Sequence, residues 1–154
     1  MISLRSWMAL GVSMLLGAAA LRAGGVEFSS DLEAAKARAA KEGKQLVIEF
    51  SGRTWCPPCK ALLAEVLPSD EFAAFAADRV VVHLDYPRKS ERTPEKIAAS
   101  PELQKLKAYA DAYKIEGFPT VVLLAPDGTE VGRVLGYEPG MGAAGFLAEL
   151  TGKK

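Results

Sequence analysis

The stretch Trp55–Cys56–Pro57–Pro58–Cys59–Lys60 decides the fold of this chain, and it contains both of the cysteines. A compact apolar run over residues 45–51 (QLVIEFS) precedes it and predicts a buried strand. An amphipathic pattern over residues 60–67 follows it and predicts a helix. The cysteine pair is therefore expected at a junction between a strand and a helix.

The two prolines between the cysteines suit the first turn of that helix, because the amide positions there have no intrahelical partner. Cys56 is then expected at the helix N-terminus, where free N–H groups and the helix dipole favour a thiolate. Cys59 is expected one turn further in and less exposed, on the same helix face. One sulfur can thus attack a disulfide and the other can resolve the product.

Two other uses of the cysteines are weaker. A zinc site needs about four protein ligands, whereas the chain offers two cysteines and one histidine, His83. We expect no metal and a structural role for His83, which lies within a strand pattern. A structural disulfide across four residues would stabilise little, ~2 kcal/mol against ~3 for a 15-residue loop. A Cys-x-x-Cys pair at a strand–helix junction favours a redox centre.

The rest of the chain alternates between helical and strand patterns. Ser30 begins a capping box, Ser100 and Pro101 mark a helix start, and residues 86–100, with two prolines and many charges, are expected to be irregular. This order predicts an α/β domain with a central mixed β-sheet flanked by helices. The expected helices cover residues 31–41, 60–67, 70–78, 101–113 and 139–150, and the expected strands residues 45–51, 79–85, 120–125 and 129–135.

The N-terminus has the pattern of a secretory signal peptide. Arg5 supplies a positive charge, residues 6–21 carry none, and small residues occupy positions 17–20. The uncharged stretch is short for a bilayer-spanning helix, which needs ~20 residues. We expect a cleaved signal peptide over residues 1–23 and a mature domain over residues 24–154, with an uncleaved N-terminal membrane anchor as the alternative. The protein is then periplasmic or secreted, in an oxidising compartment.

Composition limits the remaining choices. The 154 residues suit one domain, and 49% hydrophobic with 25% charged residues is the balance of a globular protein. The 19 basic and 19 acidic residues cancel, so nothing indicates a nucleic-acid partner. A monomer is expected.

A second motif completes a family pattern. Gly117–Phe118–Pro119–Thr120 lies some sixty residues after the cysteines and directly before a predicted hairpin. The two motifs in this order resemble the thioredoxin superfamily, and in particular the secreted thioredoxin-like proteins of bacteria. The likeness covers residues 31–150 and implies a thioredoxin fold.

The resemblance also implies roles for single residues. Cys56 matches the nucleophile, Cys59 the resolving cysteine, and Pro119 the cis-proline that faces them. Glu49 falls at the position of a buried carboxylate behind the second cysteine, if one residue is inserted between the strand and Trp55. The sequence itself makes Glu49 the charged residue of a buried strand, and burial makes a carboxylate hold its proton more tightly, which suits proton exchange with Cys59. A Glu at the strand end that faces solvent or pairs with a Lys is the alternative.

The substrate surface is expected around these residues. Trp55, Pro57, Phe118 and Thr120 are its candidate members, with Trp55 and Phe118 as an apolar docking surface. The residue before the cis-proline offers backbone hydrogen bonds to substrates in this family. Residues 86–100 form a longer connection than in plain thioredoxin, and they either contact partners or form a surface insertion.

We therefore expect a thiol–disulfide oxidoreductase without a cofactor, most directly a protein-disulfide reductase of exported proteins. A membrane thiol relay is the expected electron donor, because such a reductase needs electrons outside the cytoplasm. The alternatives are a disulfide-donating oxidase, a thioredoxin-fold adaptor and a reductant dedicated to apocytochrome cysteines.

Overall fold

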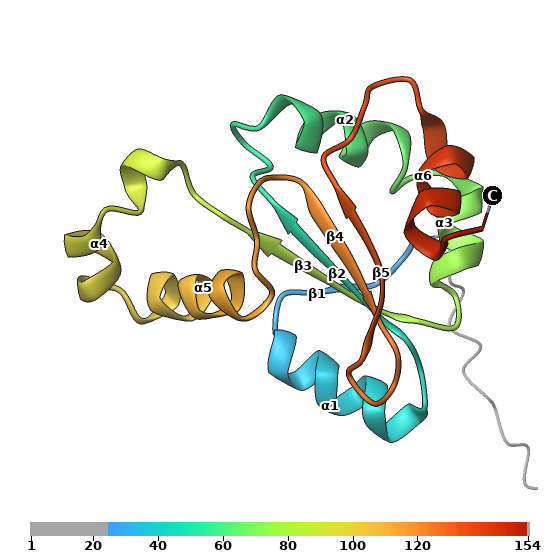
Figure 1. Ribbon diagram of the computed structural model, residues 1–154, viewed down its shortest axis with the longest axis horizontal. Helices are drawn as coiled ribbons and strands as arrows, with labels where there is room; N and C mark the ends of the chain where they lie inside the picture. Colours follow the sequence, from blue (N-terminus) through green and yellow to red (C-terminus); the bar gives the residue numbers. More distant parts are fainter. Residues whose placement is uncertain (1–24, 154) are drawn as a thin grey trace, which may run out of the picture.

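The computed structural model describes residues 25–153 (Figure 1). The predicted signal peptide, residues 1–23, lies outside the described residues, so its cleavage stays a prediction. Within residues 25–153, no helix is both long enough and apolar enough to cross a bilayer. The described chain forms one β-sheet with helices on both faces (Figure 1).

Five strands form the centre of the molecule in the order β1-β3-β2-β4-β5. β3 pairs in parallel with β1 and with β2, whereas β4 pairs antiparallel with β2 and with β5. The sheet is mixed, and this confirms the fold class predicted from the sequence. The strands are β1 (Phe28–Ser29), β2 (Leu46–Ser51), β3 (Val80–Asp85), β4 (Thr120–Leu124) and β5 (Glu130–Leu135).

Helices cover the two faces of the sheet in two groups (Figure 1). Side chains of α1 and α5 pack in one hydrophobic cluster, and side chains of α2, α3 and α6 pack in the other. The helices are α1 (Leu32–Glu42), α2 (Pro57–Glu65), α3 (Asp70–Ala76), α4 (Pro94–Ala99), α5 (Pro101–Ala112) and α6 (Gly142–Thr151), with a short 3₁₀ helix, η1 (Lys89–Glu91), before α4.

The central strand β2 is buried along its whole length. Side chains alternate between the two faces of a strand. Ile48 and Phe50 pack on the side of α1, whereas Val47 packs on the side of α2. Glu49 is two residues after Val47 and therefore lies on the face that α2 covers. The fold thus places a carboxylate beneath the helix that starts at the cysteine pair.

The segment over residues 86–100 is not irregular, and that expectation was wrong. Thr93 caps α4 by accepting the amide hydrogen of Lys96 at 3.4 Å, and Pro94 is the first helical residue. The amide of Arg88 donates to the Glu91 carboxylate at 3.0 Å across η1. Pro94 and the Glu91 carboxylate, which suggested a loop, are N-terminal signals of α4 and η1.

Two boundaries and one strand also differ from the expectation. Asp31, rather than Ser30, caps α1 through two amide hydrogen bonds. α6 begins at Gly142 rather than near Pro139. β1 was not expected at all, because two residues are too few for a periodic pattern.

Candidate active site

The cysteine pair lies at the N-terminus of α2, as predicted. Cys56 is the N-cap residue with an extended backbone (φ −93°, ψ 111°), and the two prolines are the first helical residues. The amide of Cys59 donates to the Cys56 sulfur at 3.3 Å. Cys56 and Cys59 form a disulfide bond. Because prolines have no N–H, this one amide supplies the hydrogen bond that the first turn can offer to the sulfur.

The two sulfurs differ in access, but less than expected. Cys56 is 4% exposed and Cys59 is fully buried. The amide of Gly52 donates to the Cys59 sulfur at 3.4 Å, so the inner sulfur also has a polar partner. Cys59 is the less exposed of the two cysteines, as predicted. The expectation that Cys56 is openly exposed is wrong in this disulfide form, because the Phe118–Pro119 loop approaches its sulfur.

That loop faces the cysteines from the start of β4. The Phe118–Pro119 peptide bond is cis, as the resemblance implied. The Phe118 carbonyl oxygen lies 3.6 Å from the Cys56 sulfur. Thr120 is buried, and its hydroxyl donates to the Gly117 carbonyl at 2.7 Å. Its side chain thus holds the loop in shape, and the contact of Thr120 with substrate stays a prediction.

Aromatic rings cover one side of the pair. The Trp55 indole nitrogen donates to the Tyr86 carbonyl at 2.7 Å. The Trp55 and Phe118 rings meet edge to face with centroids 5.8 Å apart, and Tyr86 lies 5.0 Å from Phe118. Trp55 and Phe118 are half-buried, and Pro57 is exposed. Trp55, Phe118 and Pro57 stay the predicted members of an apolar docking surface.

Leu135 extends this surface from β5. It pairs in register with Thr120 and is 56% exposed. Its side chain lies close to Gly117, where an added Cβ would be 3.4 Å from the Leu135 Cδ1. Leu135 was not predicted as a surface residue, because an apolar residue at the end of a strand can be buried or exposed and the sequence pattern does not distinguish the two.

Glu49 is buried, at 2% exposed, and bonds to His83, which was expected to have only a structural role. His83 on β3 lies opposite Glu49 in the parallel register, and its Nδ1 is 2.7 Å from the Glu49 Oε2. The Glu49 Oε1 and the His83 Nε2 are buried without a partner among the described residues. The solvent-facing alternative for Glu49 is wrong, and the insertion before Trp55 is consistent with this position.

The partnership with His83 had one signal in the sequence. Glu49 and His83 are polar residues in the interior of two largely apolar strands, and two buried polar groups lower each other's desolvation cost by pairing. The register that brings them together is a property of the sheet. In the described part of the chain, no three His, Cys, Asp or Glu side chains lie close enough together to hold a metal ion.

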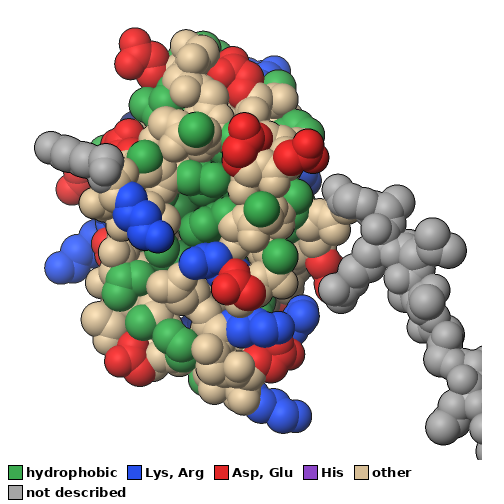
Figure 2. Space-filling view, turned by 90° about the vertical axis from the view of Figure 1, so that its right-hand side faces the viewer, with side chains coloured by type: hydrophobic (Ala, Val, Ile, Leu, Met, Phe, Trp, Pro, Cys, Tyr) green, Lys and Arg blue, Asp and Glu red, His purple; other side chains and the backbone are tan. Residues whose placement is uncertain are grey.

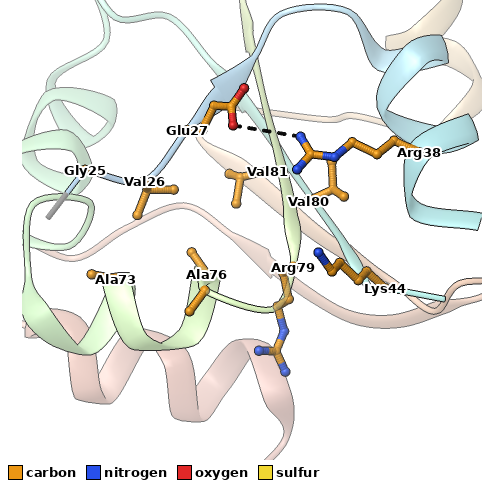
Figure 3. Close-up of a pocket in the computed structure, with 11 residues that line it drawn as sticks. Gly25, Val26, Glu27, Arg38, Lys44, Ala73, Ala76, Arg79, Val80 and Val81 are labelled. Carbon is orange, nitrogen blue, oxygen red and sulfur yellow. Dashed lines mark ion pairs between the residues drawn. The ribbon is translucent and has the colours of Figure 1, made fainter. Parts of the chain in front are cut away.

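A cavity on another part of the molecule contains none of the active-site residues described above. A cavity of about 250 Å³ lies near the start of β3, at the end of the sheet opposite the cysteines (Figure 3). Its three cations are paired: Arg38 with Glu27 at 4.0 Å, Lys44 with Glu42 at 2.7 Å and Arg79 with Asp78 at 2.6 Å. Figure 2 shows the right-hand face of Figure 1, where hydrophobic side chains gather near the centre with charged side chains of both signs around them.

Known proteins resemble this chain in sequence and in fold. Residues 32–150 match the model of the thioredoxin-like domain. A disulfide bond reductase, DsbH, of Chlamydia pneumoniae is 34% identical over 105 residues, which are 68% of this chain and 59% of that protein. A solved structure titled DsbH oxidoreductase superposes with a TM-score of 0.66 at 27% identity, covering 84% of each chain. A thioredoxin from Thermus thermophilus gives a TM-score of 0.58 at 28% identity, covering 82% of this chain and 85% of the other.

The chain therefore belongs to the thioredoxin-like family. With its Cys56–Cys59 pair it is a homologue of DsbH-type thiol–disulfide oxidoreductases. It spans about three fifths of the length of the Chlamydia relative.

Proposed function

We propose that this protein reduces disulfide bonds of exported proteins through the Cys56/Cys59 dithiol. The observation that carries the proposal is the disulfide-forming pair at the N-terminus of α2, with the Phe118 carbonyl 3.6 Å from the Cys56 sulfur. A substrate chain that pairs with the loop at Phe118 brings its own sulfur to Cys56. The name of the Chlamydia relative, a disulfide bond reductase, supports the same direction.

The reaction has two exchange steps. The Cys56 thiolate attacks one sulfur of the substrate disulfide, a Cys56–substrate bond forms, and the substrate S–S bond breaks. The leaving sulfur takes up a proton as a thiol. The Cys59 thiolate then attacks the Cys56 sulfur, the Cys56–Cys59 bond forms, and the second substrate sulfur leaves and is protonated. Two electrons pass from the dithiol to the substrate.

Glu49 takes the proton of Cys59 in the second step. It lies on the face of the sheet that α2 covers, its Oε1 has no partner among the described residues, and its Oε2 is bonded to His83. His83 is a positioning residue here, because its ring holds the carboxylate in one orientation. General-base assistance of this kind contributes typically 10²- to 10⁴-fold.

The first turn of α2 supports the reductase direction. Stabilisation of the reduced thiolate makes a disulfide more oxidising. Strong oxidants of the superfamily usually carry a His between the cysteines, whereas Pro57 and Pro58 offer neither a charge nor an N–H group. The amide of Cys59 is left as the donor to the Cys56 sulfur. The thiolate is therefore stabilised less, and the disulfide is less oxidising.

The proposed setting is the space outside the cytoplasm, reached through the signal peptide over residues 1–23. A membrane thiol relay then returns electrons to the Cys56–Cys59 disulfide. The direct partners are this relay and exported proteins with disulfides.

The reduction potential of the pair, measured by equilibration with a glutathione redox buffer, tests the direction. We expect a potential at or below about −230 mV, whereas about −120 mV would make the protein a disulfide donor. Pro58→His should raise the potential by about 30 mV or more, a tenfold change in the equilibrium constant. Pro58→Ala is the matched control: it restores one N–H without a charge and should give a smaller rise.

A further inference from the structure

The segment between β3 and α5 has no role in the chemistry described so far. Residues 87–99, which contain η1 and α4, project beyond the end of β3 (Figure 1). The family fold accounts for the sheet and the cysteines, but plain thioredoxin has a shorter connection at this place. The segment reaches the active site through Arg92, which follows η1.

Arg92 lies over two of the rings beside the disulfide. Its guanidinium carbon is 5.6 Å from the ring centroid of Phe118 and 5.8 Å from that of Tyr86. Its Nε donates to the Pro87 carbonyl at 2.8 Å, which fixes the direction of the side chain. Since the Phe118 carbonyl faces the Cys56 sulfur, a positive charge lies next to the place where a substrate chain must pass.

This charge has no ion-pair partner within residues 25–153. The acidic residues nearby in the sequence are bound to backbone amides instead. Glu91 accepts the amide hydrogen of Arg88, and Asp85 accepts that of Arg53. Arg92 is half-buried, so its field is less screened by water than that of a fully exposed side chain.

Exposed charges of both signs lie around the disulfide, and Asp85 and Glu116 are the acidic ones. Arg53 precedes the pair by three residues and Lys60 directly follows it, and both side chains are exposed. The rim of the site therefore carries charges of both signs, and Arg92 is the cation that lies over the Phe118 ring. The Arg92 Nε–H is used by Pro87, so its two terminal NH₂ groups remain to bind a carboxylate in bidentate fashion.

We propose that Arg92 is a specificity residue that makes this site favour disulfides flanked by acidic side chains. The inference rests on the proposed exchange at Cys56 but not on its direction. A carboxylate next to the substrate sulfur binds the guanidinium above Phe118 while the Cys56 sulfur attacks. A Lys or Arg at the same place in the substrate is repelled.

The test measures the first exchange step alone, in a Cys59→Ser background that leaves the mixed disulfide unresolved. The probes are three single-cysteine peptides with Glu, Gln or Lys on both sides of the cysteine, each activated as its thiopyridyl disulfide. The Cys56 thiolate displaces pyridinethiolate, which takes a proton to give pyridinethione, and the absorbance of this product gives the rate constant. We expect the Glu peptide to react faster than the Lys peptide.

Substitutions then assign the preference to Arg92. Arg92→Gln should lower the Glu-to-Lys rate ratio roughly three- to tenfold. This is the size expected for the loss of one unit charge in contact with a substrate carboxylate near the protein surface. Arg92→Lys should keep most of the ratio, and Arg92→Glu should invert it. Lys41→Glu, at the far end of α1, is the matched control for Arg92→Glu, with the same change of net charge, and it should leave the ratio unchanged.

Each outcome separates the inference from the proposed function. Equal rates for the Glu and Lys peptides, an unchanged ratio in Arg92→Gln, or an equal loss in Lys41→Glu would overturn the inference and leave the exchange chemistry intact. A Gln peptide that does not react at all would overturn the proposed function, and the inference with it. If the Arg92 variants do not fold, the protein that keeps Arg92 provides the test. Its Glu-to-Lys rate ratio must fall as the salt concentration rises, and a ratio that does not depend on salt contradicts the inference.

Discussion

Single residues around the disulfide determine which sulfur reacts. Cys56 caps α2 and accepts the amide hydrogen of Cys59, whereas the Cys59 sulfur is fully buried against Gly52. After reduction, the hydrogen bond and the helix N-terminus both favour the thiolate at Cys56. The two thiols are therefore unequal although only two residues separate them.

In the reduced protein, Cys56 should be alkylated before Cys59, and at a pH below the ~8.5 at which a free thiol is half ionised, because these interactions favour the thiolate form of Cys56. Brief treatment with iodoacetamide over a pH series, followed by peptide mapping, measures this. Equal labelling of the two thiols, or Cys59 labelled first, would contradict the assignment of the nucleophile.

Glu49 and His83 are the second pair that matters at this scale. Removing the acid while keeping the shape of Glu49 should slow the resolution of the mixed disulfide, because the proton of Cys59 then has no acceptor. For Glu49→Gln we expect roughly ten- to hundredfold slower resolution and little change in the formation of the mixed disulfide. The fold should be at least as stable, since an amide is less costly to bury than a charge.

Stopped-flow kinetics with a model disulfide separates these two steps. Glu71→Gln, on the exposed surface of α3, is the matched control and should change neither. If resolution in Glu49→Gln is as fast as in the unsubstituted protein, Glu49 serves the structure alone.

At the scale of elements, Tyr86 connects the end of β3 to the site and to α5. Its ring packs between Phe50 and Phe118, and its hydroxyl donates to the Leu106 carbonyl of α5 at 2.8 Å. Burial raises the pKa of Tyr86 well above its usual value. The contact therefore depends on a protonated hydroxyl, and it ties the element that follows the inserted segment to the sheet.

Tyr86→Phe should lower the free energy of unfolding at neutral pH by about 1 kcal/mol, the contribution of one hydrogen bond. The folded-state pKa of Tyr86 lies above its unfolded value near 10, so its contribution is complete below about pH 10 and is lost as the pH rises further. The stability difference between the two proteins should therefore shrink in alkaline solution. Urea unfolding between neutral and alkaline pH measures both effects.

Tyr109→Phe on α5 is the control for that experiment. The Tyr109 hydroxyl is buried without a hydrogen-bond partner among the described residues, so its removal should cost little at neutral pH. A larger loss in Tyr109→Phe than in Tyr86→Phe would mean that ring packing, and not the hydroxyl of Tyr86, ties α5 to the sheet.

At the scale of the whole molecule, the reactive end and the opposite end of the sheet differ in character. The disulfide, the Phe118–Pro119 loop and Arg92 lie where β2 and β3 end and β4 begins. The other end has paired charges around the cavity of Figure 3, next to the residues that follow the predicted signal peptide. A chain tethered or cleaved at its N-terminus would thus have its redox centre directed away from that terminus.

Processing should leave a mature N-terminus between residues 21 and 24. The reason is the uncharged stretch after Arg5 and the small residues before Leu21. Mass analysis of the N-terminus of the exported protein measures it. An intact Met1 in membrane-embedded material would instead favour the anchor.

The sequence alone determined the class of fold and the place of the cysteines. Apolar runs of strand length, helix caps and proline positions are local signals, so they do not depend on distant contacts. The strand–helix junction at Trp55–Lys60 and the mixed sheet were therefore predictable. The cis-proline and the buried Glu49 came from resemblance, and the structure agrees with both positions.

The tertiary structure decided the contacts between elements. The partnership of Glu49 with His83 depends on the register of β2 against β3, and a shift of one residue would turn one side chain to the other face. The place of Arg92 over Phe118 depends on how residues 87–99 fold back across a separation of twenty-six residues. The pairing of β4 with β5 brings Leu135 beside Thr120, whose hydroxyl bonds to Gly117 within the loop. Local patterns specify elements, whereas a site made of several elements exists only after packing has brought them together.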